Sequence, residues 1–119
     1  MDAKIKAEWL ACLRDGTYVQ TKEFRLQDVD GHFDPIGVLC DRAVAAGVLP
    51  KPRFFDRGVE GRVFFGYTYE SGNHTTATRL PKAVEEWAGI EYWTANHIQS
   101  MSDKGKTFAQ IADWIEENL

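Results

Sequence analysis

Basic and aromatic residues are interleaved in the middle of this chain, a combination that can bind phosphate groups and nucleobases. Arginine presents a fork of N–H donors that suits phosphate oxygens, and aromatic rings stack on bases. The alternative is that the rings form the apolar face of a sheet while the arginines are solvated, and we favour it for Val63 and Phe65. The residues kept as candidates for a binding site are Arg53, Arg57, Arg62, Tyr67, Tyr69 and His74.

Acidic residues gather at the end of the chain, on the last predicted helix. Each acid near a helix C-terminus opposes the helix dipole and costs about a few tenths of a kcal/mol. Their position suggests a partner with a basic surface, although solubility alone is the more frequent explanation. A tryptophan beside them is a natural anchor for such a partner if it is exposed. This candidate partner surface consists of Asp113, Trp114, Glu116 and Glu117.

Nucleophiles and metal ligands give weaker signals. Cys40 with a histidine would form a nucleophile and base pair, but it lies on the apolar face of a predicted helix and is better interpreted as a buried thiol. The histidines, His32, His74 and His97, show no metal-ligand spacing. The sequence also contains no nucleophile elbow or phosphate-binding glycine loop. We therefore lean against an enzyme and expect no catalytic residues, cofactor or metal site, with a small Cys/His hydrolase as the second alternative.

Alternating acids at Asp28, Asp30 and Asp34 faintly resemble a calcium loop. An EF-hand loop needs glycine at its sixth position and glutamate at its twelfth, and here these positions hold Phe33 and Leu39. Turn formation and helix capping explain the acids better.

Composition and charge limit the classes of protein to which this chain can belong. The chain has 119 residues, of which 44% are hydrophobic, which fits a single domain over residues 1–119. Its net charge of −4 argues against a general nucleic-acid coat, yet residues 51–82 carry +3 and leave −7 for the rest. No apolar run approaches the roughly 20 residues that span a bilayer, and the first residues lack the apolar segment of a secretion signal. We expect a cytoplasmic protein that does not contact membranes.

Local signals predict where the helices begin and end. Apolar spacing predicts a helix over Ala3–Arg14. Asp34 and Pro35 have the residue types of an N-cap and a first helical position, and Gly47 and Pro50 stop the helix between them. Further helices are predicted over Lys82–Ala88, before the stop at Gly89, and after the capping box of Thr107 and Gln110, whereas the Glu91–Ser102 segment is ambiguous.

Alternation over Arg62–Tyr69, a turn at residues 71–73 and threonines over Thr75–Arg79 predict a hairpin. We expect a third strand over Arg53–Phe55 and short extended pieces before the second helix. Two strands alone are marginal in water, so the sheet must rest on a helix. The fold class expected is α+β, with a small antiparallel sheet packed on about four helices.

Four blocks together give the chain a resemblance to a known kind of protein. They are KAEWLACLRDGTYVQ (6–20), PIGVLCD (35–41), LPKAVEEW (80–87) and DKGKTFAQIADWIEENL (103–119). In this order they resemble a set of small uncharacterised proteins of bacteriophages and prophages. The chain departs from that set at Phe33–Pro35, where the relatives often carry cysteines.

The resemblance implies a viral accessory protein in the host cytoplasm. The first hypothesis is a non-enzymatic protein that binds a host protein or a small molecule, for example to counter a host defence. The alternative is a module that binds nucleotides or nucleic acid through the basic aromatic hairpin.

Overall fold

The computed structural model describes the backbone of all residues except 60–61 and the side chains of all residues except 55–65. Helices and an antiparallel sheet are both present, so the α+β fold class is confirmed. Within the described chain the helices are α1 (Ala3–Arg14), α2 (Pro35–Ala45), α3 (Lys82–Ala88), α4 (Tyr92–Asp103) and α5 (Phe108–Asn118). The strands are β1 (Arg53–Val59), β2 (Arg62–Ser71) and β3 (His74–Thr76).

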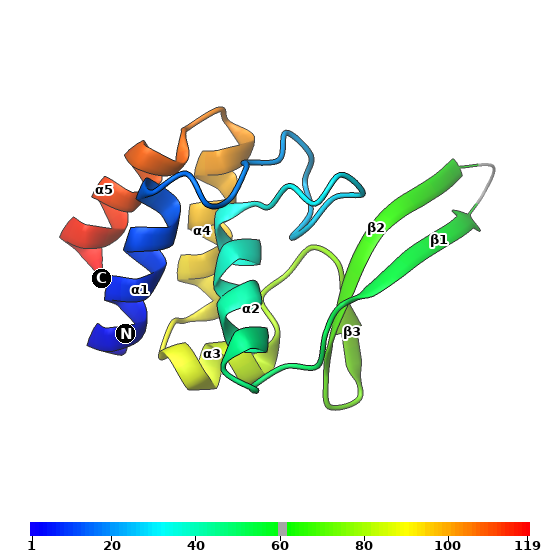
Figure 1. Ribbon diagram of the computed structural model, residues 1–119, viewed down its shortest axis with the longest axis horizontal. Helices are drawn as coiled ribbons and strands as arrows, with labels where there is room; N and C mark the ends of the chain where they lie inside the picture. The colour runs from blue at the N-terminus through cyan, green and yellow to red at the C-terminus, as the bar shows by residue number, and fades with distance from the viewer. Residues whose placement is uncertain (60–61) are drawn as a thin grey trace.

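Four helices form a closed ring around the core (Figure 1). Helix α1 packs against α2 and α5, and α4 packs against the same two helices, while α3 packs against α2. The indole N–H of Trp9 donates a hydrogen bond of 2.9 Å to the carbonyl of Pro35, which ties α1 to the first turn of α2. Both groups are buried, so this bond fixes how the two helices meet.

The second helix is the centre of this body, and its local signals are confirmed. The Asp34 carboxylate caps it by accepting a hydrogen bond from the N–H of Gly37, and Pro35 occupies its first position. At its end Gly47 takes a φ of +78°. The N–H of Val48 then donates to the carbonyl of Ala43 at 2.9 Å, which completes a glycine-dependent C-cap. Most residues of the helix are buried in the core, including all of its first six.

The sheet has the order β1-β2-β3 and is antiparallel throughout. The predicted hairpin is confirmed as β2 and β3, although β3 ends at Thr76. The predicted third strand starts at Arg53 as expected but runs on to Val59, and it pairs with β2 from Arg53↔Thr68 to Val59↔Arg62. The longest ladder of the sheet is therefore β1 with β2.

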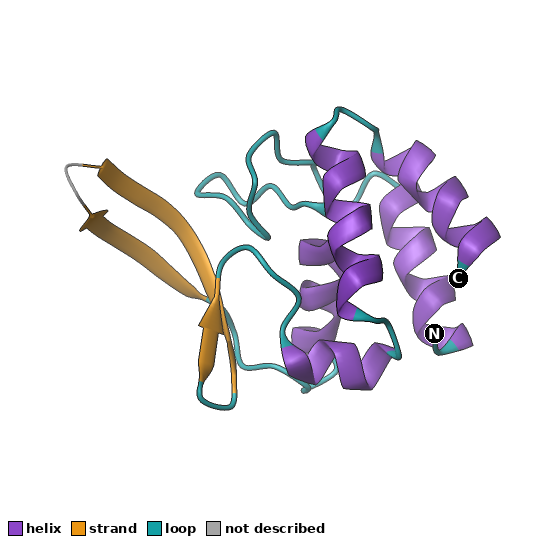
Figure 2. Cartoon of the chain, turned by 180° about the vertical axis from the view of Figure 1, so that it is seen from behind, coloured by secondary structure: helices purple, strands orange, loops and turns teal. Residues whose placement is uncertain are grey.

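We define the arm as β1 together with residues 62–68 of β2. Both views of the chain show the arm projecting from the helices, and α5 lies at the opposite end of the molecule (Figures 1 and 2). The sheet thus meets the helical body at one end, through Tyr69 and the loop around Gln27. The N–H of Tyr67 donates to the backbone carbonyl of Gln27 at 3.3 Å. The hydroxyl of Tyr69 donates to the side-chain oxygen of the same glutamine at 2.9 Å.

Two segments differ from the simplest expectation. The ambiguous Glu91–Ser102 segment is helical over Tyr92–Asp103, because Ala95 and Ile98 are buried on one side. The extended pieces expected before α2 form bridges through Gln20 and Gln27, each with Phe33, rather than strands. None of the described helices has the length and apolar character to cross a membrane.

Candidate functional site

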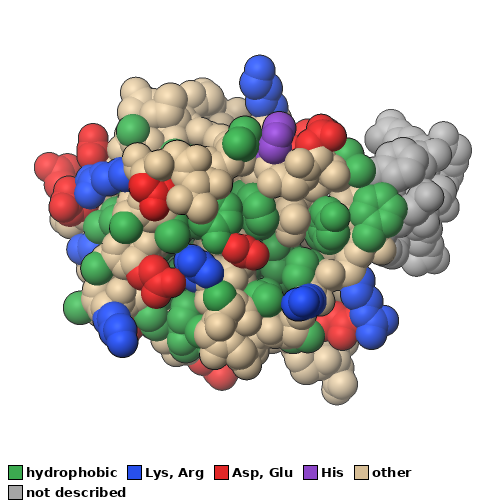
Figure 3. Space-filling view, in the orientation of Figure 1, with side chains coloured by type: hydrophobic (Ala, Val, Ile, Leu, Met, Phe, Trp, Pro, Cys, Tyr) green, Lys and Arg blue, Asp and Glu red, His purple; other side chains and the backbone are tan. Residues whose placement is uncertain are grey.

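The arm carries a pair of aromatic rings at its base, of which Phe54 is exposed. Phe54 and Tyr67 face each other across β1 and β2, with ring centroids 5.7 Å apart in an edge-to-face arrangement. Phe54 is 51% exposed, and Tyr67 is partly buried. Hydrophobic side chains reach the surface beside the base of the arm (Figure 3). Such rings lose little conformational entropy on binding and contribute much contact area.

Next to this pair lies the first of the predicted binding residues, Arg53. Its side chain is exposed, and its Nε lies 3.3 Å from Oε1 of Glu70 on β2. Exposed ion pairs of this kind contribute at most about 1 kcal/mol, so a phosphate or carboxylate of a partner can compete for the guanidinium. Arg53 precedes Phe54 in β1 and pairs with Thr68, so its side chain lies on the face of the strands opposite to the two rings.

Arg57 and Arg62 belong to the arm by register. Arg57 pairs with Phe64 and Arg62 with Val59 across the two strands. Their side chains, like those of Val63 and Phe65, lie outside the described residues. The sequence places these two arginines on the arm, and their role there stays a prediction.

The other two predicted binding residues lie away from the aromatic pair. Tyr69 is fully buried, and burial raises the pKa of its phenol. Its ring is part of the core and is not available to stack on a ligand, which corrects the prediction. Alternation put Tyr67 and Tyr69 on one face, but β2 passes from the projecting arm into the helical body between them. His74 is exposed and begins β3, at the far end of the sheet from the arm.

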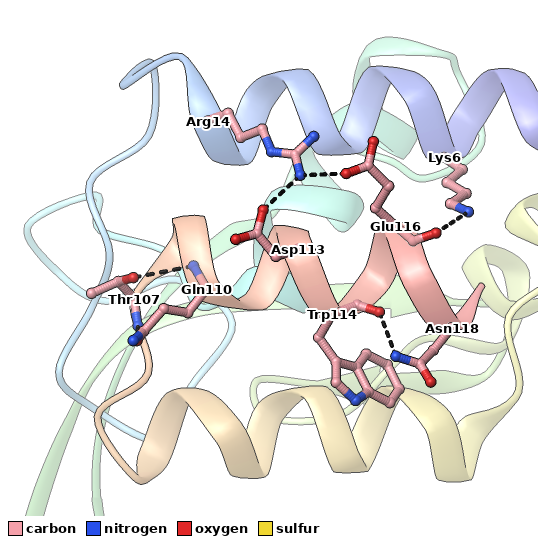
Figure 4. A network of polar contacts seen from close by, with 8 residues as sticks. All are labelled: Lys6, Arg14, Thr107, Gln110, Asp113, Trp114, Glu116 and Asn118. Carbon is pink, nitrogen blue, oxygen red and sulfur yellow. Dashed lines mark hydrogen bonds and ion pairs between the residues drawn. The ribbon is translucent and has the colours of Figure 1, made fainter.

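The acidic helix α5 has its counter-charge within the chain (Figure 4). One Nη of Arg14 on α1 lies 2.9 Å from a carboxylate oxygen of Asp113 and 2.9 Å from one of Glu116. The ammonium of Lys6 also donates to the backbone carbonyl of Glu116 at 3.2 Å. Asp113 and Glu116 thus have a basic partner within the chain, but both remain exposed, and their contact with a basic partner protein stays a prediction. Sequence reasoning missed the contact with Arg14 because α1 and α5 meet only in the folded chain.

The remaining members of the predicted partner surface differ from each other. The ring of Trp114 is half-buried and lies against His97 of α4, with centroids 5.0 Å apart. Glu117 is exposed. Trp114 thus points toward α4, away from Asp113 and Glu116, which form ion pairs with Arg14 (Figure 4).

The cysteines and acids that could do chemistry are explained by structure. Cys40 has no exposed surface, and burial raises the pKa of its thiol well above the usual value, so it is unsuited to attack a substrate. Asp28 accepts hydrogen bonds of 2.9 Å from the N–H groups of Asp30 and His32, which is turn formation as predicted. Among the described residues, no three His, Cys, Asp or Glu side chains gather closely enough to hold a metal ion.

A cavity of about 430 Å³ opens between the loop at Gln20 and the C-terminal end of α4. The side-chain amide of Gln20 bridges it by donating to Ser102 Oγ at 3.0 Å and to the carbonyl of Lys106 at 2.8 Å. Its lining combines Lys22 and Lys106 with the carboxyl of Asp103. The cavity is therefore lined by charges of both signs.

The largest exposed aromatic residue was not among the predicted sites. Trp93 on the first turn of α4 is 77% exposed, and its ring meets the edge of Tyr92 at 5.5 Å. Helical spacing could have found it, since a helix that buries Ala95 and Ile98 leaves Trp93 outside the core.

Comparisons with curated proteins and with solved structures give no match. A family model described as a domain of unknown function, DUF8296, matches residues 1–98. The match includes the arm and α1 to α3, reaches into α4 and stops before α5. Since it covers well over half of the sequence, the chain belongs to the DUF8296 family.

Proposed function

We propose that this protein is a non-enzymatic binding protein that contacts a partner through its arm. The observation that carries the proposal is the projection of the arm from the helical body with Phe54 exposed on it. A two-stranded ribbon that packs on little else is marginally stable in water, so folding alone does not explain it. Binding to a partner would cover the exposed rings and stabilise the ribbon.

A protein is the first choice of partner. Aromatic residues are enriched in the centres of protein interfaces, and Phe54 and Tyr67 lie together at the base of the arm. In the described sheet β1 is an edge strand, so its outer N–H and C=O groups can pair with a strand of the partner. The resemblance to phage proteins supports a host protein, met in the host cytoplasm, and a role against host defences.

Nucleic acid is the second candidate, and a specific observation favours it. A two-stranded antiparallel ribbon has the dimensions that enter the major groove of B-DNA. The arm carries Arg53, Arg57 and Arg62 in sequence, within the segment of net charge +3. Small molecules are less favoured because the arm projects from the body and the cavity near Gln20 has mixed charge.

Site-specific photo-crosslinking tests the protein-binding proposal. A photoreactive phenylalanine analogue replaces Phe54, and the control carries the same group at Glu8, which is exposed on α1. In lysates of candidate hosts, the variant at position 54 should crosslink one protein that the control does not. The crosslink should also be competed by unmodified protein. Equal crosslinking from both positions, or none from position 54 in any host, would argue against the arm.

Fluorescence anisotropy with labelled single- and double-stranded DNA tests the second candidate. Binding through the arm should weaken steeply as salt rises and should be lost in the double variant Arg57→Ala, Arg62→Ala. The matched control is Lys4→Ala with Lys6→Ala, which removes the same charge from α1. Absent binding, or binding that does not respond to salt, removes nucleic acid as a candidate.

A further inference from the structure

A second surface of the molecule exposes aromatic rings that no role in folding explains. Trp93 leaves 77% of its surface in water, on the first turn of α4. Tyr92 lies edge-to-face with it at 5.5 Å and is itself exposed. Tryptophan is usually well covered in folded proteins, so an exposed tryptophan–tyrosine pair is a marker of an interaction site.

These two rings are part of a larger surface that crosses two helices. Trp93 and His97 are four residues apart on α4 and therefore lie on the same side of the helix. His97 in turn contacts the ring of Trp114 on α5 at 5.0 Å, with the ring planes inclined by 53°. We call these four residues, Tyr92, Trp93, His97 and Trp114, the aromatic strip.

The charges beside the strip are acidic and exposed. Glu91 is exposed and directly precedes Tyr92, and Glu117 is exposed one turn beyond Trp114. The acids Asp113 and Glu116 contact Arg14 on the other side of α5, so they do not compete for the same partner. The basic side chain of Arg79 donates to Asn96 of α4 and lies over the ring of Phe24.

We propose that the aromatic strip is a docking surface for a basic segment of a partner protein. A lysine or arginine of that segment stacks on the exposed face of Trp93, and neighbouring basic residues pair with Glu91 and Glu117. Cation–π contacts are strongest with tryptophan, and the two carboxylates make the surface selective for positive charge. The strip includes α5, which lies at the opposite end of the molecule from the arm, so this binding does not depend on the function proposed for the arm.

The probe for the test is a synthetic 12-residue peptide that alternates lysine and leucine pairs, compared with one in which glutamate replaces lysine. Binding is followed by NMR through the indole N–H signals of the chain's tryptophans. The lysine peptide should shift the signals of Trp93 and Trp114 but not that of Trp9, which is fully buried. Trp93→Ala should weaken binding by about tenfold or more, and the double variant Glu91→Gln, Glu117→Gln by a few-fold.

Two controls keep the result specific. Val29→Ala removes an exposed apolar side chain elsewhere and should leave the affinity unchanged. A variant in which Asn-Gly replaces residues 54–67 should also bind the lysine peptide normally, which separates this proposal from that for the arm. Circular dichroism melting of Trp93→Ala should match the parent chain, because its side chain lies mostly in water.

The proposal fails if the lysine and glutamate peptides bind equally well, or if Trp93→Ala binds the lysine peptide as tightly as the parent chain. It also fails if sedimentation shows a dimer that Trp93→Ala abolishes, because a second copy of the chain would then be the occupant of the strip.

Discussion

At the scale of single residues, Gly37 shows how closely the loop before α2 packs onto that helix. A Cβ atom at this position would lie 1.8 Å from the carbonyl oxygen of Leu26, which is a backbone atom and cannot rotate away. Leu26 is fully buried, and its N–H donates to the carbonyl of Ala77 at 2.8 Å. The loop at Leu26 therefore contacts α2 on one side and Ala77 on the other. Only glycine at position 37 leaves space for the carbonyl of Leu26.

We therefore predict that Gly37→Ala destabilises the protein. Alanine gains up to about 1 kcal/mol of helix propensity over glycine, but overpacking against fixed backbone costs about 1–3 kcal/mol or more. The cost of the clash should exceed the gain in helix propensity, so urea denaturation should show a lower free energy of unfolding for Gly37→Ala than for the parent chain. Lys4→Ala on the exposed side of α1 is the control and should change this value by less than about 0.5 kcal/mol. A Gly37→Ala variant as stable as the control would contradict the packing described.

Asp34 is the second residue whose environment has a measurable consequence. Its carboxylate is buried and accepts hydrogen bonds from the N–H of Gly37 at 2.6 Å and from the side-chain amide of Gln99 at 3.0 Å. Burial nevertheless outweighs these bonds and raises its pKa from 3.8 to about 7. The folded chain therefore holds a proton on Asp34 at pH values where the unfolded chain has lost it.

This shift makes stability depend on pH. Between about pH 4 and pH 7 the folded state binds more protons at Asp34 than the unfolded state does, so the free energy of unfolding falls as the pH rises. The contribution across this window is on the order of 1–4 kcal/mol. Asp34→Asn cannot ionise and should flatten the dependence in urea denaturation at a series of pH values, whereas the exposed control Asp30→Asn should not. Parallel curves for the parent chain and Asp34→Asn would show that Asp34 titrates normally.

At the scale of elements, α2 was predictable because its signals are local. Its N-cap, first proline and C-terminal glycine act through hydrogen bonds and backbone angles within a few residues of each other. Helices α1, α3 and α5 were predicted for the same reason. Helix α4 was ambiguous because no side chain caps its N-terminus and because Trp93 breaks its apolar pattern.

Gly47 allows one quantity to be measured by itself: the free-energy cost of positive φ for a non-glycine residue at the C-terminal end of α2. Its φ is +78°, and a Cβ atom there would meet nothing within 4 Å, so a substitution changes only the backbone preference. Gly47→Ala should lower the free energy of unfolding by about 1–2 kcal/mol. Gly47→Asn should cost less, because asparagine tolerates positive φ better. Thermal denaturation of the three chains tests this order, and an alanine variant as stable as glycine would contradict it.

The arm is an element whose strands were predictable but whose position was not. Alternation indicated β2, and the segment at Arg53 indicated β1. Whether such a hairpin lies on a helix or projects depends on what covers its faces, and here the described contacts of the loop at Gln27 are with its base. Arg25 of this loop approaches Gly66, where a Cβ atom would lie 2.9 Å from its guanidinium. Contacts between residues this far apart in sequence leave no local signal.

At the scale of the whole molecule, α5 closes the ring of helices and completes the core. Phe108, Ile111, Ala112 and Ile115 are all buried, and the N–H of Phe108 donates to the side chain of Gln20 at 3.0 Å. The family match stops before this helix, yet the core of this chain extends through it. Among the residues whose side chains are described, the sheet contributes Tyr69 to the core, and this residue lies just beyond the arm.

Deletion of α5 and deletion of the arm should have opposite effects on the cooperativity of thermal unfolding. A chain that ends at Lys106 loses four buried side chains of α5 and should show no cooperative thermal transition. Replacement of residues 54–67 by Asn-Gly removes a similar number of residues but should leave a cooperative transition. Circular dichroism melting of both variants is the measurement. A cooperative transition in the chain ending at Lys106 would show that α5 is dispensable for the fold.

The sequence by itself determined the fold class, the bounds of most helices and the hairpin of β2 with β3. These follow from short-range hydrogen bonds, backbone angles and the periodicity of apolar residues, which are all written within a few residues of each other. Only the tertiary structure decided that Tyr69 is core and Trp93 is exposed, that Arg14 holds Asp113 and Glu116, and that the arm projects. The reason is that burial and ion pairing depend on which elements, far apart in the sequence, pack against each other. Local patterns of residue types do not show these contacts.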